Sequence, residues 1–208
     1  MRTILLTGFE AFGGDSRNPS ADAVASVAAA YDGPDRLITA TLPVSYEGAA
    51  LELRSLIAEH DPDAVIATGL AGGSDRVAVE RVGINLMDAR IADNDGARPI
   101  DQPCEPGGPA ARFATMPVKR AVAALDEAGI PARASLSAGS YVCNHVLYTA
   151  LGAVPPTVPT GFVHLPWSTS TAPDDAPSLP DDVIARAVRC CIDLVFEPER
   201  PVPGGAIW

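Results

Sequence analysis

The stretch TILLTGFEAFGGDSRNPSADAVASVAAA, from Thr3 to Ala30, joins an apolar segment to a helix-forming segment through a glycine-rich turn. Residues 3–7 are typical of a short buried strand. A helix is expected over residues 20–30, because the NPS sequence at residues 18–20 supplies side chains that favour a helix start. The order of strand, turn and helix is the repeating unit of an α/β fold.

The same alternation continues along the chain. Strands are expected over residues 37–42, 64–69, 132–137 and 161–165, and helices over residues 46–60, 117–128, 142–151 and 181–196. Residues 77–91 have mixed spacing and are expected to form irregular strands around a site, whereas residues 93–108 and 168–180 have the composition of loops. This alternation predicts an α/β/α sandwich with a largely parallel, twisted central sheet.

The chain has 208 residues, which is sufficient for one large domain. One series of strands and helices runs past both predicted loops, so a single domain is expected over residues 1–208, with residues 198–208 as a Pro/Gly-rich tail. Hydrophobic residues make up 47% of the chain and charged residues 20%, which favours a packed core over disorder.

Membrane and secretory segments are not expected. No apolar run approaches the roughly 18 residues that a membrane span requires. The first residues, MRTILLTGF, have too short an apolar stretch for a signal peptide and no small-residue cleavage site. The sequence therefore predicts a cytoplasmic protein with no membrane partner.

The charge balance bears on possible partners. The net charge is −11, Lys119 is the one lysine, and the arginines form no cluster. Nucleic acid is not an expected partner, because its binding requires several cations that neutralise phosphates. Four cysteines, at positions 104, 143, 190 and 191, form no C-x-x-C pair, and their low density fits a reducing compartment.

The glycine-rich turn resembles a phosphate loop only in part. Gly8 and Gly13 have the spacing of the pattern G-x-x-x-x-G-K-[ST]. Gly14 stands where that pattern requires lysine, and Asp15 stands where it requires serine or threonine. No G-x-G-x-x-G follows any predicted strand, so a nucleotide-binding module is a poor alternative.

Cys143 is the candidate nucleophile. Open α/β sheets bind ligands at the carboxyl ends of their strands, and the turn SAGSYVCNH lies between a predicted strand and the helix that begins near Cys143. A helix N-terminus favours a thiolate and supplies N–H groups that can bind an oxyanion. The simpler interpretation is a buried apolar cysteine, which we expect for Cys191 on the apolar stripe of the last helix. Cys104 lies in a Pro-rich loop where no base is evident.

A cysteine nucleophile needs a base, and the chain has three histidines. His145 is two residues from Cys143, roughly 200° around a helix, and is expected to point away from it. His60 ends a predicted helix and is expected at the surface. His164 lies in GFVHLP at the end of the last predicted strand. It is the preferred base, although a core histidine is the simpler interpretation.

A third group should orient the imidazole of the base. The candidate carboxylates are Glu80, Asp88, Asp93 and Asp95. Glu80 is preferred because its apolar neighbours in VAVERVGIN indicate burial, and a buried carboxylate requires a partner. Spacing alone does not choose among the four.

Together these motifs resemble the pyroglutamyl peptidase I family, also called pyrrolidone-carboxylate peptidases, which are cysteine peptidases that remove N-terminal 5-oxoproline. The resemblance is carried, in order, by TGFEAFGG (7–14), NPS (18–20), GLAGG (69–73), ERV (80–82), IN (84–85), DARI (88–91), DN (93–94), GGPAA (107–111), SAG (137–139), CNH (143–145) and GFVHLP (161–166). These motifs extend over most of the chain, which makes them far more specific than any one of them alone.

The resemblance implies a catalytic triad of Glu80, Cys143 and His164 that requires no metal and no organic cofactor. It also implies a set of residues that contact the substrate or lie near it: Phe9, Phe12, Asn18, Leu70 and Arg90. The implied substrates are peptides with an N-terminal pyroglutamyl residue. The implied assembly is a homotetramer or homodimer of single α/β domains.

Two features of the sequence bear on this expectation. A pyroglutamyl ring is neutral and has an apolar flank, so Phe9 and Phe12 can offer it flat apolar surface, unless both belong to the core. The family is expected to have arginine directly after the two glycines of GLAGG, whereas this chain has Ser74, with Arg76 two residues later.

A zinc-dependent hydrolase is a further alternative. Cys143, His145 and His164 would have to bind the metal. Their positions lack the usual spacing of zinc ligands. The cysteine peptidase is therefore the preferred interpretation.

Overall fold

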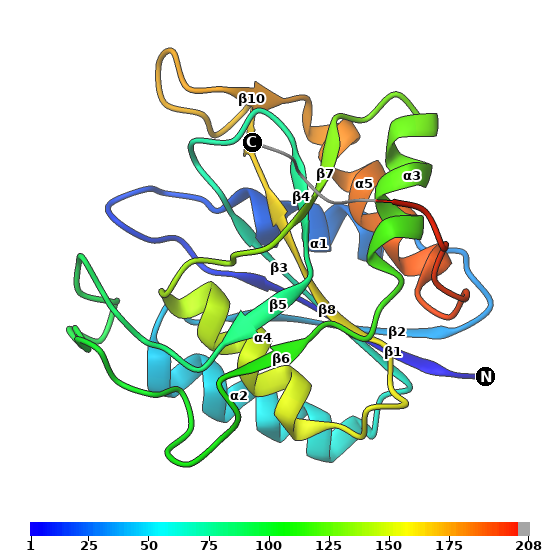
Figure 1. Ribbon diagram of the computed structural model, residues 1–208. Helices are drawn as coiled ribbons and strands as arrows, with labels where there is room; N and C mark the ends of the chain where they lie inside the picture. Colours follow the sequence, from blue (N-terminus) through cyan, green and yellow to red (C-terminus); the bar gives the residue numbers. More distant parts are fainter. Residues whose placement is uncertain (204–208) are drawn as a thin grey trace.

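The computed structural model describes residues 1–203 of the chain, and its central feature is a six-stranded sheet in the order β2-β1-β3-β8-β4-β7 (Figure 1). The sheet contains β1 (Thr3–Phe9), β2 (Arg36–Leu42), β3 (Ala64–Leu70), β4 (Val77–Glu80), β7 (Ala132–Ser135) and β8 (Thr160–Leu165). The helices are α1 (Pro19–Ala30), α2 (Tyr46–His60), α3 (Val118–Glu127), α4 (Val142–Ala153) and α5 (Asp181–Leu194). This α/β architecture confirms the predicted fold class.

The helices cover both faces of the sheet. Alternation along β1 turns Ile4 and Leu6 toward one face and Leu5 toward the other. The first face packs against α1, α3 and α5, and the second against α2 and α4. Figure 1 shows these two groups of helices on opposite sides of the sheet. The sandwich thus has two apolar layers, and side chains on the α2/α4 face can reach the start of α4.

Strand direction changes once across the sheet. Strands β2, β1, β3 and β8 run parallel, as predicted, but β4 pairs antiparallel with β8, and β7 pairs parallel with β4. The register places Gly69 of β3 and Ala78 of β4 on either side of His164. This reversal had no signal in the apolar pattern, because a buried strand has the same composition in either direction.

Three short strands, over residues 111–113, 167–168 and 178–179, lie where none was predicted. β5 (Val82–Ile84) pairs with β6 (Ala111–Phe113), and β9 (Trp167–Ser168) pairs with β10 (Ser178–Leu179). The last two fall in or beside the loop predicted over residues 168–180, so that prediction is wrong at its ends. Strands of two or three residues are too short to show a periodic pattern.

Of the predicted tail, residues 198–203 are described and residues 204–208 lie outside the described part. Glu199 binds the start of α3, because its carboxylate accepts hydrogen bonds from the backbone N–H groups of Lys119 (3.0 Å) and Arg120 (2.9 Å). A carboxylate at a helix N-terminus is electrostatically favourable. In residues 1–203, no helix combines the length and apolarity needed to cross a membrane.

Gly8 is required by the packing of α1 against β1. A Cβ atom on Gly8 would lie 2.7 Å from the carbonyl oxygen of Ser20 and 2.9 Å from the backbone nitrogen of Ala21. The same helix start is fixed by hydrogen bonds, since the Ser20 hydroxyl accepts from the N–H of Phe9 (2.9 Å) and donates to Oδ1 of Asn18 (2.9 Å). The backbone of α1 therefore cannot move away from β1 without breaking these hydrogen bonds.

Gly8→Ala is expected to lower the free energy of unfolding by about 1–3 kcal/mol, the usual cost of overpacking a tight contact. Urea unfolding followed by circular dichroism measures this change. Gly73→Ala is the matched control, because no atom lies within 4 Å of the position its Cβ would take. Equal unfolding midpoints for the two variants would contradict this account of Gly8.

Candidate active site

Three elements bring the predicted triad residues to one place on the α2/α4 face of the sheet. Along β8, Val163 and Leu165 point to the α1/α3/α5 face, so His164 points to the other. The same alternation along β4 puts Glu80 on the side of His164. Cys143 is the second residue of α4, which packs on that face.

Glu80 and His164 form a buried pair. Oε1 of Glu80 is 2.8 Å from Nδ1 of His164, and the two residues are 1% and 8% exposed. Because an ionised carboxylate only accepts hydrogen bonds, Nδ1–H of His164 is the donor. This fixes the tautomer of neutral His164 and leaves Nε2 for the other side of the ring.

The surroundings keep His164 protonated. Burial by itself lowers the pKa of His164, but the charge and hydrogen bonding of Cys143, followed by those of Glu80, raise it to about 9. Imidazolium is thus the favoured form of His164 at neutral pH when Cys143 and Glu80 are both negative. A thiolate next to an imidazolium is the form in which cysteine acts as a nucleophile.

Gly69 makes room for Cys143. A Cβ atom on Gly69 would lie 3.0 Å from Sγ of Cys143 and 2.8 Å from the ring of Phe162. The ring of Phe162 in turn packs against His164, with ring centroids 4.7 Å apart. The glycine of the predicted TGLAGG turn is therefore needed for the sulfur to approach the sheet.

The first turn of α4, which contains Cys143, has no side-chain cap. Tyr141 occupies the N-cap position without a side-chain capping hydrogen bond. The first N–H groups of a helix have no partner within the helix. The N–H groups around Cys143 can therefore donate to a negatively charged oxygen.

A cavity of about 170 Å³ lies beside Cys143. Its wall contains Phe9, Phe12, Asp15, Arg17, Asn18, Val44, Leu70, Tyr141, Val142 and Cys143. Four residues predicted to lie near the substrate are in this wall: Phe9, Phe12, Asn18 and Leu70. Arg90 is exposed and is not part of the wall, so its role stays a prediction.

Aromatic side chains form much of the cavity wall. The rings of Phe12 and Tyr141 have centroids 5.5 Å apart, and Tyr141 meets Tyr46 edge-on, also at 5.5 Å. The hydroxyl of Tyr141 donates to the carbonyl of Ala92 at 3.0 Å, which ties the loop after β5 to the start of α4. Tyr141 was not among the predicted site residues, although its position two residues before Cys143 is a usable signal.

Phe9 and Asn18 have structural roles besides lining the cavity. Phe9 is 2% exposed and belongs to the core on the α2/α4 face. Asn18 caps α1 by accepting from the N–H of Ser20 (3.0 Å), and its amide donates to the carbonyl of Glu10 (2.9 Å). Both interpretations considered for Phe9, core and cavity wall, therefore apply.

The other candidate carboxylates and histidines lie elsewhere. Asp93 is buried, and its carboxylate accepts from the backbone N–H groups of Tyr46, Asp95 and Ala97. His145 packs against Tyr46, and burial lowers the pKa of His145 to about 4. No group of three or more His, Cys, Asp or Glu side chains in residues 1–203 is placed to hold a metal ion.

Ser74, at the position where arginine was expected, forms a local turn. Its hydroxyl donates to the carbonyl of Arg76 at 2.7 Å, and Arg76 pairs with Asp75. Ser74 is half-buried and Arg76 is exposed, and neither lines the cavity. The hydrogen bond within this turn gives Ser74 a local structural role.

A larger cavity of about 460 Å³ lies between α2, α4 and the segment around β6. Arg112 crosses it, with its guanidinium 2.6 Å from Glu105 and 4.0 Å from the ring centre of Tyr148. None of the predicted triad residues lines this cavity. Size alone therefore does not identify the functional site.

The chain is similar in sequence to known peptidases. The family described as Pyroglutamyl peptidase matches residues 2–197. The pyrrolidone-carboxylate peptidase of Clavibacter michiganensis subsp. michiganensis is 48% identical over 209 residues, which cover 99% of this chain and 98% of that protein. The pyrrolidone-carboxylate peptidase of Thermococcus kodakarensis is 46% identical over 198 residues, which cover 93% and 96%.

Solved structures agree with the sequence matches. Pyroglutamyl peptidase I from Bacillus amyloliquefaciens has a TM-score of 0.92 to this chain at 37% identity, covering 98% of this chain and 99% of that one. The pyrrolidone carboxyl peptidase from Thermococcus litoralis has a TM-score of 0.90 at 34% identity, covering 95% and 94%.

Cys143 is expected to react with iodoacetamide before the other three cysteines at pH 7.5. Burial raises the pKa of Cys104 to about 11 and also raises the pKa values of Cys190 and Cys191, so these remain thiols. His164→Ala should slow labelling of Cys143, because it removes the base that lies beside the sulfur. Peptide mass spectrometry of timed samples measures each rate. Faster labelling of Cys104 than of Cys143 would contradict the assignment.

Proposed function

The chain belongs to the pyroglutamyl peptidase family, as its motifs predicted, and we propose that it is a cysteine exopeptidase that hydrolyses the bond after an N-terminal pyroglutamyl (5-oxoproline) residue. The position of Cys143 carries this proposal: it starts α4, interacts with the buried Glu80–His164 pair and lines an apolar cavity. A nucleophile, a base and a carboxylate that orients the base, arranged in this order, make up a catalytic triad.

The cavity suits the substrate ring. The pyroglutamyl ring is an uncharged lactam with an apolar flank, and the rings of Phe12 and Tyr141 offer flat apolar surface beside Cys143. Leu70 and Val44 extend that surface. A ring of this kind needs no cation, which agrees with the absence of a phosphate-loop lysine from the turn after β1.

In the first half of the proposed reaction, the thiolate of Cys143 attacks the pyroglutamyl carbonyl carbon and forms a C–S bond. The oxygen becomes an oxyanion, which the N–H groups at the start of α4 stabilise. His164 as imidazolium then gives its Nε2 proton to the leaving amine. The C–N bond breaks, the shortened peptide departs, and a thioester remains on Cys143.

In the second half, neutral His164 takes a proton from a water molecule, whose oxygen attacks the thioester carbonyl. The C–S bond breaks, which restores the thiolate of Cys143 and the imidazolium of His164 and releases pyroglutamic acid. Glu80 holds Nδ1–H throughout, so that Nε2 always faces the reacting atoms. No step requires a metal or an organic cofactor.

The assembly rests on the resemblance alone, and the location rests on the short apolar stretch at residues 1–9 and the low cysteine density. We propose a cytoplasmic homo-oligomer, either a tetramer or a dimer. Light scattering of the purified protein would contradict this assembly if the particle had the mass of one chain.

Cys143→Ala is expected to lower kcat/KM for pyroglutamyl-7-amido-4-methylcoumarin by roughly 10³-fold or more, because the proposed reaction loses its nucleophile. Fluorescence of the released coumarin measures the rate in reducing buffer with EDTA. Cys104→Ala is the matched control and should retain activity, since Cys104 does not line the cavity beside Cys143. Equal turnover by Cys143→Ala and the wild type would overturn the triad. Loss of wild-type turnover to EDTA would favour a metal-dependent hydrolase.

A further inference from the structure

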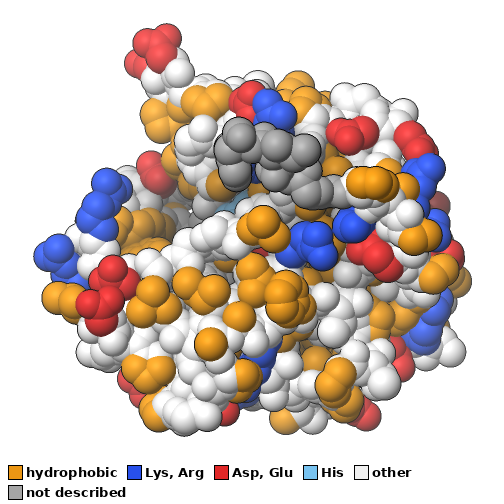
Figure 2. Space-filling view, in the orientation of Figure 1, with side chains coloured by type: hydrophobic (Ala, Val, Ile, Leu, Met, Phe, Trp, Pro, Cys, Tyr) orange, Lys and Arg blue, Asp and Glu red, His pale blue; other side chains and the backbone are white. Residues whose placement is uncertain are grey.

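Two charged residues stand at the mouth of the cavity beside Cys143. Most of the cavity wall is apolar, but Asp15 and Arg17 belong to it as well. Both come from the loop between β1 and α1, and the side chain of Arg17 is 53% exposed. A residue that lines a cavity and is half exposed lies at its opening. Figure 2 shows that one face of the molecule is hollowed, with histidine surface in the hollow and basic and acidic side chains nearby.

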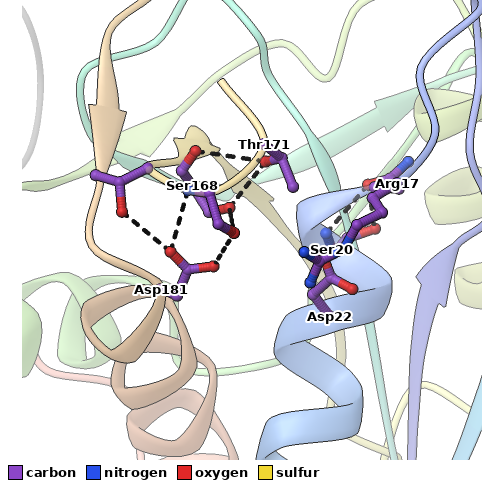
Figure 3. Close-up of polar contacts among 9 residues, drawn as sticks. Arg17, Ser20, Asp22, Ser168, Thr171 and Asp181 are labelled. Carbon is purple, nitrogen blue, oxygen red and sulfur yellow. Dashed lines mark hydrogen bonds and ion pairs between the residues drawn. The ribbon is translucent and has the colours of Figure 1, made fainter. Parts of the chain in front are cut away.

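Arg17 forms an ion pair with Asp22. Nη2 of Arg17 is 3.0 Å from Oδ2 of Asp22, in the first turn of α1. Figure 3 shows this pair at the start of α1, facing the polar group of Ser168, Thr171 and Asp181 at the start of α5. A small cavity of about 60 Å³ separates the two groups, and Arg17, Asp22, Ser168 and Asp181 are in its wall.

The guanidinium of Arg17 keeps donors for a further partner. A guanidinium has five N–H donors. Within residues 1–203, Asp22 is the one acidic side chain paired with Arg17, and no hydrogen bond to another group occupies the remaining donors. The proposed chemistry at Cys143 does not use this cation, because the pyroglutamyl ring is uncharged.

The part of a substrate that reaches the mouth is the peptide after the scissile bond. In the proposed complex the ring occupies the apolar part of the cavity and the carbonyl of the scissile bond lies at Cys143, so a peptide of any length must leave through the opening. Arg17 lies at that opening, between the cavity beside Cys143 and the small cavity at the start of α5.

We propose that Arg17 is a specificity-determining residue that favours substrates with a carboxylate in the residue directly after pyroglutamate. The carboxylate accepts from the free N–H groups of Arg17, while the charge of Asp22 keeps the guanidinium near the start of α1. It can belong to an acidic side chain or to the free C-terminus of a pyroglutamyl dipeptide. The inference rests on the proposed peptidase activity and adds a preference to it.

The test compares kcat/KM for three substrates: pyroglutamyl-Ala-NH2, pyroglutamyl-Glu-NH2 and pyroglutamyl-Ala-OH. The first has no carboxylate, the second has one on the side chain, and the third has one at the C-terminus. Each charged substrate is expressed as a ratio to the neutral one. A ratio does not depend on the fraction of active enzyme, so partial misfolding of a variant does not produce the expected change.

Arg17→Gln is expected to lower the ratio for at least one charged substrate about two- to fivefold, the range for a solvent-exposed ion pair. The effect should shrink in 0.5 M NaCl, because salt screens exposed charges. Arg186→Gln is the matched control: Arg186 is an exposed arginine of α5 that also pairs with an aspartate. It removes the same charge and should leave both ratios at their wild-type values.

Three outcomes separate the possibilities. A fall with Arg17→Gln alone supports the proposal, and the substrate affected shows which carboxylate is recognised. Ratios that do not change, or that change equally with Arg186→Gln, overturn it while leaving the peptidase activity in place. A wild type that hydrolyses none of the three substrates overturns the proposed function itself.

Discussion

The buried pair of Glu80 and His164 is the interaction on which the rest of the site depends. Two ionisable side chains that are 1% and 8% exposed are stable there only as partners, because a single unpaired charge at such a position costs several kcal/mol. The pair requires that β4 run antiparallel to β8, which sets Glu80 diagonally across from His164. The direction of β4, the burial of Glu80 and His164, and the position of the proton on Nδ1 of His164 therefore depend on one another.

Gly8 near the end of β1 and Gly69 near the end of β3 are both required by packing at the same edge of the sheet. Gly69 lacks a Cβ because the sulfur of Cys143 and the ring of Phe162 occupy that space. At Gly8, the space that a Cβ atom would need is occupied by the backbone of α1. The glycine-rich turn after β1 therefore brings a helix close to a strand and places Phe12 and Arg17 at the cavity, and these roles do not involve a phosphate.

Much of the fold follows from the sequence because its signals are local. The structure begins and ends α2 at the predicted residues, and capping by Ser45 and the left-handed Asp61 explains why. Cys143 was predicted as the nucleophile from a strand, a small-residue turn and a helix start, all within a few residues, and the structure places it at the start of α4. Glu80 was chosen over three other carboxylates from its apolar neighbours, and the pairing with His164 gives that choice a physical basis.

The remaining features depend on contacts between distant segments. The reversal of β4 and β7 changes no residue type in either strand, so no pattern predicts it. Tyr141 and Arg17 reach the cavity because separate loops meet there, and the sequence does not give their distance from Cys143.

The central claim is that Cys143 and Glu80 together keep His164 protonated in the folded protein. Its most direct test is an NMR titration of His164 in histidine-labelled wild type and Glu80→Gln. The account predicts a pKa of about 9 in the wild type and a lower value in Glu80→Gln, where burial continues to favour the neutral ring. Because the pKa is raised on folding, the interactions of His164 with Cys143 and Glu80 stabilise the protein fully below pH 6.5, and this contribution is lost as pH rises through about 9. A wild-type pKa at or below 6.5, unchanged by Glu80→Gln, would contradict the account.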